Sequence, residues 1–189
     1  VDVIERFIKI ITYIFCMFFN RTCETRMMCY LKIQISHNIA FGQPSASHHS
    51  IEKAAQVSHI LPDINDLPGG FKTSVGERGV TLSGGQKQRV SISRAFLIQP
   101  KILLLDDALS SVDTSTENEI LKNLHKELKG QTMILISHRI STVRKADQIL
   151  VLDKGRIVER GTHVQLISKN GFYTELCKKQ RLLDELDQQ

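Results

Sequence analysis

Two solid apolar runs, KILLLD at 101–106 and TMILIS at 132–137, constrain the fold of this chain more than any other feature. Neither run alternates apolar with polar residues, which is typical of strands that are buried on both faces of a parallel sheet. Between the runs, residues 114–128 repeat apolar side chains with the period of an amphipathic helix. The order strand, helix, strand therefore predicts an α/β fold whose parallel sheet is covered by helices on both faces.

Capping residues and apolar periodicity predict the remaining elements. Ser47 or Ser50 is the expected N-cap of a helix over IEKAAQVSHIL, and Asp113 or Ser115 is the expected N-cap of the helix at 114–128. The other predicted elements are helices at 85–98, 162–169 and 172–187, a third buried strand at 148–153 and a hairpin return through Gly155.

Residues 1–34 differ in composition from the rest of the chain, and we can assign them no motif. The apolar run FIKIITYIFCMFF at 7–19 is shorter than the roughly 20 residues of a membrane-spanning helix, and Lys9 interrupts it. Its acidic flank and the lack of a small-residue cleavage site also argue against a signal peptide. Three of the four cysteines lie in this segment, and we expect free thiols, with a metal site or a disulfide as alternatives.

Length and charge set broad limits on the chain. Its 189 residues fit one domain, and a hydrophobic fraction of 41% is that of a globular protein. The net charge of +5 is spread over Lys and Arg that are dispersed among Asp and Glu. This basic balance suits phosphate ligands, a membrane-adjacent site or nucleic acid, so it selects none of them.

Three short motifs carry chemistry. The strand ILLLDD delivers Asp106 and Asp107 to the carboxyl edge of the sheet, where ligands bind in α/β folds, so Asp106 is a candidate for magnesium and Asp107 for orienting water. TLSGGQKQR places glycines and the Ser83 hydroxyl at a helix N-terminus, which suits an anion. ILISH places His138 after the second strand, where it can contact a phosphate. Taken singly, each motif is also compatible with a capping or turn role.

The order and spacing of these motifs resemble those of ATP-binding cassette (ABC) ATPases. LSGGQKQRVSISRA resembles their signature motif, KILLLDD the Walker B strand, SSVD at 110–113 the D-loop and ILISH the switch-histidine loop. NIAFG, VGERGVTLSGGQ and ADQILVLDKGRIVERGTH resemble the exporter-type nucleotide-binding domains. The resemblance covers roughly residues 35–180.

The resemblance implies a RecA-like P-loop NTPase core with an inserted helical subdomain, incomplete in this chain. We expect an atypical segment at 1–34, the helical subdomain ending in the signature helix at 35–100, and the C-terminal part of the core with its helices at 101–189. It further implies ATP and Mg²⁺ as cofactors, a second nucleotide-binding domain and an exporter's transmembrane domain as partners, and no nucleic acid. The expected location is the cytoplasmic face of a membrane, that of the bacterial inner membrane.

The resemblance also assigns roles to residues. In the family, two domains sandwich ATP head to tail, so the signature residues of this chain would contact ATP held by the partner. Asp106 would serve magnesium, and Asp107 and His138 would act in catalysis on ATP held by this chain's own core. The residues assigned to the signature and D-loop are Ser83, Gly84, Gly85, Gln86, Ser111 and Asp113.

Two departures from the family pattern bear on activity. The family usually has a glutamate general base where this chain has Asp107, whose carboxylate is set back by about 1.5 Å, the length of one C–C bond. Residues 1–80 contain no G-x-x-x-x-G-K-[ST] loop, and Arg26 stands where the family pattern places the Q-loop glutamine. We interpret the chain as truncated at its N-terminus or read in a shifted frame there, and we expect no ATPase activity from it alone.

The predicted function is therefore that of a partial ATP-binding and ATP-hydrolysing domain of an exporter. The alternative is a non-catalytic remnant or degenerate-site partner that offers its signature helix to another subunit, and Asp107 makes a heterodimer a serious option. A DNA-repair or chromosome-organising ABC ATPase fits less well, because NIAFG and GRIVERGTH are exporter features. The sequence does not identify the transported substrate.

Overall fold

The computed structural model describes residues 22–24, 33–76 and 80–186, so the apolar run at 7–19 lies outside the described residues. The described residues fall into two compact units, which divide after Ile136. The elements are β1 (Thr22–Glu24), α2 (Ile35–Ile39), η1 (Ala40–Gly42), α3 (His48–Val57), α4 (Leu61–Asn65), η2 (Gly70–Lys72), α5 (Gly84–Leu97), β2 (Ile102–Asp106), α6 (Thr114–Glu127), β3 (Thr132–Ile136), α7 (Ile140–Val143), β4 (Ile149–Asp153), β5 (Arg156–Gly161), α8 (His163–Ser168) and α9 (Phe172–Leu186).

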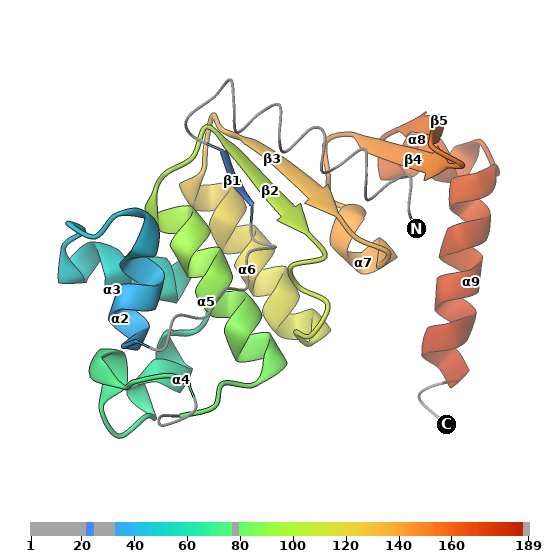
Figure 1. Cartoon of the computed structure of the whole chain (residues 1–189). Coiled ribbons are helices and arrows are strands. Elements are labelled where there is room, and N and C mark those ends of the chain that lie inside the picture. The colour runs from blue at the N-terminus through green and yellow to red at the C-terminus, as the bar shows by residue number, and fades with distance from the viewer. Residues whose placement is uncertain (1–21, 25–32, 77–79, 187–189) are drawn as a thin grey trace. The chain divides into compact units, whose positions relative to one another are not determined.

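A parallel sheet of three strands organises the first unit (Figure 1). The strand order is β1, β2, β3, and β2 pairs with β3 from Ile102 opposite Thr132 to Asp106 opposite Ile136. The strands predicted at 101–106 and 132–137 are both confirmed within a residue at each end. Because the strands are parallel and in register, Asp106 lies at the carboxyl edge of the sheet, as the sequence predicted.

Helices α5 and α6 pack on one face of this sheet (Figure 1). Leu103 and Leu105 of β2 are fully buried against that face, and Met133 and Leu135 of β3 pack with them. Strand geometry turns the intervening residues to the opposite face, where Ile134 is 40% exposed. Among the described residues, α5 and α6 lie on one face, and Leu104 on the opposite face is also buried, so helical cover of the second face stays a prediction.

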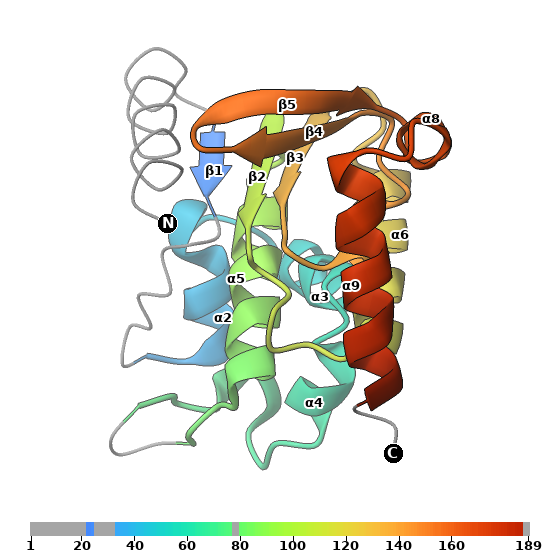
Figure 2. The same cartoon turned by 90° about the vertical axis from the view of Figure 1, so that its right-hand side faces the viewer.

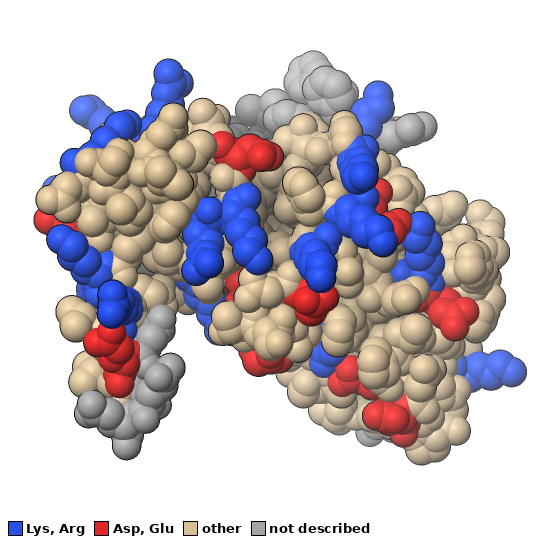
Figure 3. Space-filling view, turned by 180° about the vertical axis from the view of Figure 1, so that it is seen from behind, with Lys and Arg blue, Asp and Glu red and all other residues tan. Residues whose placement is uncertain are grey.

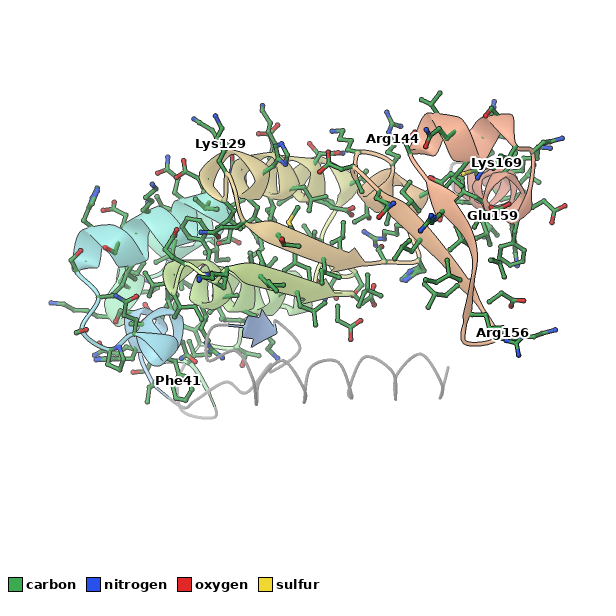
Figure 4. All side chains as sticks on the ribbon, turned by 90° about the horizontal axis from the view of Figure 1, so that it is seen from above. Phe41, Lys129, Arg144, Arg156, Glu159 and Lys169 are labelled. Atoms are coloured by element: carbon green, nitrogen blue, oxygen red, sulfur yellow. The ribbon has the colours of Figure 1, made fainter. Side chains whose placement is uncertain are left out.

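A helical subdomain forms the rest of the first unit. Ser47 caps α3 by accepting a hydrogen bond from the Ser50 amide, which decides between the two predicted caps. Short helices α2 and α4, which the sequence analysis missed, pack into the same core as α3 and α5, and the Ser58 and Ser93 hydroxyls meet there at 2.6 Å. Figure 4 shows Phe41 at the edge of this subdomain, where the Arg94 guanidinium lies 5.6 Å from its ring centre.

The second unit is built on the β4–β5 hairpin and the helices α7, α8 and α9. Figure 2 shows the hairpin with α8 and α9. β4 pairs antiparallel with β5 in a sheet of its own, and its residues alternate between buried and exposed at the start. The prediction of a third buried strand like β2 and β3 is therefore wrong, whereas the hairpin return is confirmed. Lys154 and Gly155 carry the turn with φ of 47° and 75°, as a two-residue hairpin requires.

Helices α8 and α9 close the second unit. Ile149, Val151, Leu166 and Tyr173 form its buried core. Burial raises the pKa of Tyr173 to about 12, with a further contribution from nearby Cys177, while its hydroxyl lies 2.9 Å from His163 Nδ1. Burial likewise raises the pKa of the Cys177 thiol, a free cysteine as predicted.

The surface charge and the helix lengths can be compared with the expectations from charge and hydropathy. On the face seen in Figure 3, Lys and Arg side chains stand among Asp and Glu side chains, which agrees with the dispersed charge of the sequence. Among the described residues, no helix combines the length and apolar character needed to cross a membrane.

Candidate functional site

The N-terminal turn of α5 presents backbone donors beside a serine hydroxyl. Ser83 is the N-cap, and a capping box forms in which Ser83 Oγ accepts from the Gln86 amide at 3.2 Å while Gln86 Oε1 accepts from the Ser83 amide at 2.9 Å. The amides of Gly84 and Gly85 come next, and in the first turn of a helix they have no acceptor within the helix itself. Together with the helix dipole, these donors suit an anionic ligand.

Gln88 joins this helix to the turn that follows β2. Its Oε1 accepts from the Ser111 amide at 2.9 Å, and its Nε2 donates to Ser110 Oγ at 2.9 Å. Only 7% of Gln88 is exposed, so these hydrogen bonds are largely shielded from water. The sequence analysis missed this residue. The sequence feature that could have identified it is its spacing. Gln88 is a polar residue four positions after Gly84 and three after Gly85, so it lies on the same face of the helix.

Gly85 allows the helix and the turn to approach each other. A Cβ at this position would lie 2.7 Å from the carbonyl oxygen of Ser111, which is too close for two unbonded atoms. At Gly84 the nearest atoms to an added Cβ are those of the Ser111 side chain at 3.4 Å, an ordinary contact. The second glycine of the pair is therefore required by packing, whereas the first is not.

The two aspartates after β2 occupy different positions. Asp106 is the last residue of the strand and is half-buried, whereas Asp107 is exposed and has φ of 47°. The Asp107 amide donates to the Ile136 carbonyl at 3.0 Å, and its own carbonyl accepts from Ser110 Oγ at 3.0 Å. A non-glycine residue in this left-handed region is uncommon and marks a constrained position.

Asp113 caps the next helix. Its Oδ1 accepts from the Thr116 amide at 2.9 Å, so Asp113 and not Ser115 is the N-cap of α6. This hydrogen bond lowers the pKa of the Asp113 carboxyl from its ordinary value. Ser111 and Asp113 thus belong to one turn, and Gln88 ties that turn to the start of α5.

A carboxylate outside the predicted motifs also contacts the start of α5. Asp63 of α4 accepts from Gln86 Nε2 at 2.9 Å and from both Nη atoms of Arg89, at 2.8 and 3.0 Å. Burial alone raises the pKa of Asp63, but the hydrogen bonds from Gln86 and Arg89 and the Arg89 charge outweigh it, and the pKa falls below its ordinary value. No sequence motif marks this residue.

The lowered pKa of Asp63 leads to an expected acid effect. The carboxylate stabilises the fold above its unfolded pKa of 3.8, and this contribution is lost as the pH falls through the lower folded value. Urea unfolding at about pH 5 and about pH 3 should show a smaller acid-induced loss of unfolding free energy in Asp63→Asn than in the wild type. Equal losses in both proteins would contradict this assignment.

The structure brings most of the predicted site residues together in the first unit. The signature residues, Ser111 and Asp113 meet through Gln88, and Asp106 and Asp107 follow from β2 into the same turn. His138 is exposed and belongs to the second unit, two positions after the end of β3. Among residues 22–24, 33–76 and 80–186, no group of three or more His, Cys, Asp or Glu is arranged to hold a metal.

A profile described as ABC transporter matches residues 17–110. A multidrug resistance-like ATP-binding protein MdlA of Buchnera aphidicola is 50% identical over 154 residues, which are 81% of this chain and 26% of that protein. An ATP-dependent lipid A-core flippase of Pseudomonas fluorescens is 50% identical over 143 residues, 75% of this chain and 24% of that protein. A bacterial Atm1-family ABC exporter solved with ATP bound superposes with a TM-score of 0.79 at 41% identity, over 85% of this chain and 28% of that chain.

The chain belongs to the ABC transporter family. It is part of an exporter-type nucleotide-binding domain, and it spans about a quarter of the length of the relatives that it matches. The ABC match begins at residue 17 and so includes part of the segment before residue 35 to which we could assign no motif. Within that part, β1 pairs in parallel with β2, from Thr22 opposite Ile102 to Glu24 opposite Leu104.

Proposed function

We propose that this chain supplies the signature helix and the Walker B strand of an exporter's ATP-binding domain, and that it works against a second domain that holds ATP. The observation that carries the proposal is the Gln88 bridge. Because Gln88 bonds both Ser110 and Ser111, hydrogen bonds join the helix that carries the N-terminal donors to the D-loop. This connection can couple closure of the two domains on the partner's ATP to the conformation of the D-loop.

The residues present fit an ATP phosphate and a magnesium ion. Ser83 and the amides of Gly84 and Gly85 would hold the γ-phosphate of ATP bound to the partner. Asp106 would serve magnesium, which proteins commonly hold with one or two carboxylates together with the substrate phosphates. When bound, the ion would neutralise charge on the phosphates. His138 would contact the γ-phosphate in this chain's own core, and Asp107 would orient the attacking water.

The expected partners are a second nucleotide-binding domain and an exporter's transmembrane domain. Support comes from the relatives, which include a lipid A-core flippase, and from the solved exporter with ATP bound. In this arrangement the chain would lie at the cytoplasmic face of a membrane, the bacterial inner membrane in our proposal, and would couple ATP hydrolysis to transport.

The alternative of a degenerate-site partner is favoured by Asp107. Its carboxylate is one C–C bond shorter in reach than the glutamate of the family pattern, and its backbone is fixed by the bonds to Ile136 and Ser110. A backbone held on both sides cannot shift forward to make up the lost reach. In this version the chain supports hydrolysis at the partner's site and not at its own.

Complementation tests both versions. The partner is a complete exporter nucleotide-binding domain whose own signature serine and second glycine have been replaced, so that it has a phosphate loop but no working signature. We expect no ATP turnover from either protein alone and clear turnover in the mixture, measured as phosphate release. Turnover by this chain alone that Asp106→Asn abolishes would contradict the expected inactivity. A mixture no more active than its parts would overturn the proposed function.

The variant Ser83→Arg provides the matched control for that mixture. Ser83 is exposed, so the substitution places a long side chain over the donors at the start of α5. It also removes the N-cap, at a cost of about 1 kcal/mol, and leaves the buried core unchanged. We expect this variant to fold and to restore no turnover. Restoration by Ser83→Arg at the wild-type level would show that the activity does not pass through the signature.

A further inference from the structure

We propose that Asp63 is a positioning residue for the signature turn, which is the first turn of α5 with its N-cap (residues 83–86), and that it acts through Gln86 and Arg89. The inference rests on the proposed function, because it concerns how the donors at the start of α5 are aimed at a partner's ATP. Asp63 lies on α4, outside every motif that resembles the family pattern, and about a quarter of its side chain is exposed. Its three hydrogen bonds all go to side chains of α5.

Gln86 is held at both ends of its amide. Oε1 accepts from the Ser83 amide at 2.9 Å, and Nε2 donates to Asp63 Oδ1 at 2.9 Å. The side chain therefore links the carboxylate of α4 directly to the backbone of the N-cap. Because both polar atoms of its side chain are hydrogen-bonded, Gln86 fixes the orientation of the turn. The groups that would bind the phosphate are then the Ser83 hydroxyl and the amides of Gly84 and Gly85.

Arg89 holds the same carboxylate one turn further along α5. Its two Nη atoms bind the two oxygens of Asp63 in a bidentate pair, which has a more restricted geometry than a single hydrogen bond. Nη1 also donates to the His59 carbonyl at 2.6 Å, and Nε donates to the Gly85 carbonyl at 3.4 Å. The carboxylate is thereby anchored to the loop before α4 and to the first turn of α5.

Gln88 holds the turn at a second point. It binds the D-loop, while Gln86 and Arg89 bind α4, so the signature turn is fixed against two separate parts of the unit. A helix start fixed at one point can pivot, whereas one fixed at two points keeps its direction. Removal of Asp63 should therefore loosen the capping box without unfolding the helix.

Hydrogen exchange of the 189-residue chain tests this inference without any partner. In Asp63→Ala we expect the Ser83 and Gln86 amides, both bonded in the capping box, to exchange about tenfold faster than in the wild type, with α6 unchanged. Asp63→Asn keeps an acceptor for Gln86 and loses the charge facing Arg89. In this variant we expect the same two amides to exchange about threefold faster than in the wild type. The control Glu127→Gln weakens the ion pair to Lys53, at 2.6 Å, and should leave both amides unchanged.

The outcomes are distinguishable. Wild-type exchange rates in Asp63→Ala, or an equal increase across α5 and α6, would overturn the positioning role. In the complementation mixture, a merely structural role predicts that Asp63→Ala raises the chain concentration needed for half-maximal turnover. A positioning role predicts that the maximal rate itself falls, by about tenfold, and recovers in part in Asp63→Asn. If the wild-type chain restores no turnover, the proposed function fails, and hydrogen exchange still decides the role of Asp63.

Discussion

Gly85→Ala is expected to lower the free energy of unfolding of this chain by about 1–2 kcal/mol and to abolish complementation. The added methyl group would lie 2.7 Å from the Ser111 carbonyl oxygen, so the start of α5 and the D-loop must move apart. Overpacking costs roughly 1–3 kcal/mol, from which the better helix propensity of alanine removes up to about 1 kcal/mol. Urea unfolding gives the stability change, and phosphate release in the mixture gives the functional change.

Gly84→Ala is the matched control for this variant. Here the added methyl group meets only the Ser111 side chain at 3.4 Å, and the substitution should leave stability within about 0.5 kcal/mol of the wild type or raise it slightly. Equal destabilisation by both variants would show that the effect comes from the loss of glycine in a helix turn. It would contradict the close approach of Gly85 to Ser111.

Gly171→Ala is expected to destabilise the second unit by about 2 kcal/mol or more, because it breaks a helix cap that comes from another element. Glu159 of β5 accepts from the amides of Phe172 and Tyr173, at 3.0 and 2.8 Å, and so caps α9 with a full negative charge at the helix N-terminus. Figure 4 shows Glu159 in this unit. A Cβ on Gly171 would overlap Glu159 Oε1, so the carboxylate would have to leave.

Thermal or urea unfolding followed by hydrogen exchange would measure this effect. Exchange of the Phe172 and Tyr173 amides should increase strongly in Gly171→Ala. It should increase less in Glu159→Gln, which keeps an acceptor oxygen and loses the charge. A Gly171→Ala protein with wild-type stability and wild-type exchange at these two amides would contradict the cap.

Some features of the fold could be read from local patterns because local physics decides them. The apolar runs at 102–106 and 132–136 are strands within a residue of their predicted ends, and Ser83, Asp113 and Ser47 are caps, since a cap depends on neighbours within three residues. Helices α2, α4 and α7 escaped detection because four or five residues are too few to show a helical period.

Pairing between distant elements could not be read in the same way. The run at 149–153 is as apolar as β2, but it forms a hairpin with β5 because a two-residue turn brings that strand back at once. The predicted signature and D-loop residues are in one place, yet Gln88, which joins them, and Asp63, which holds Gln86, lie outside the residues singled out from the sequence.

The sequence by itself determined the family, the order of the motifs and the chemical groups available at each, because motif spacing and strand periodicity are properties of the chain. Only the tertiary structure decided which groups hold the others in place. Gln88 reaches Ser111 across 23 positions and Asp63 reaches Arg89 across 26, and a hydrogen bond between such distant residues depends on how helices pack, which no local pattern records. The same reason separates Gly84 from Gly85: the pair looks equivalent in sequence, and only the approach of Ser111 makes the second glycine necessary.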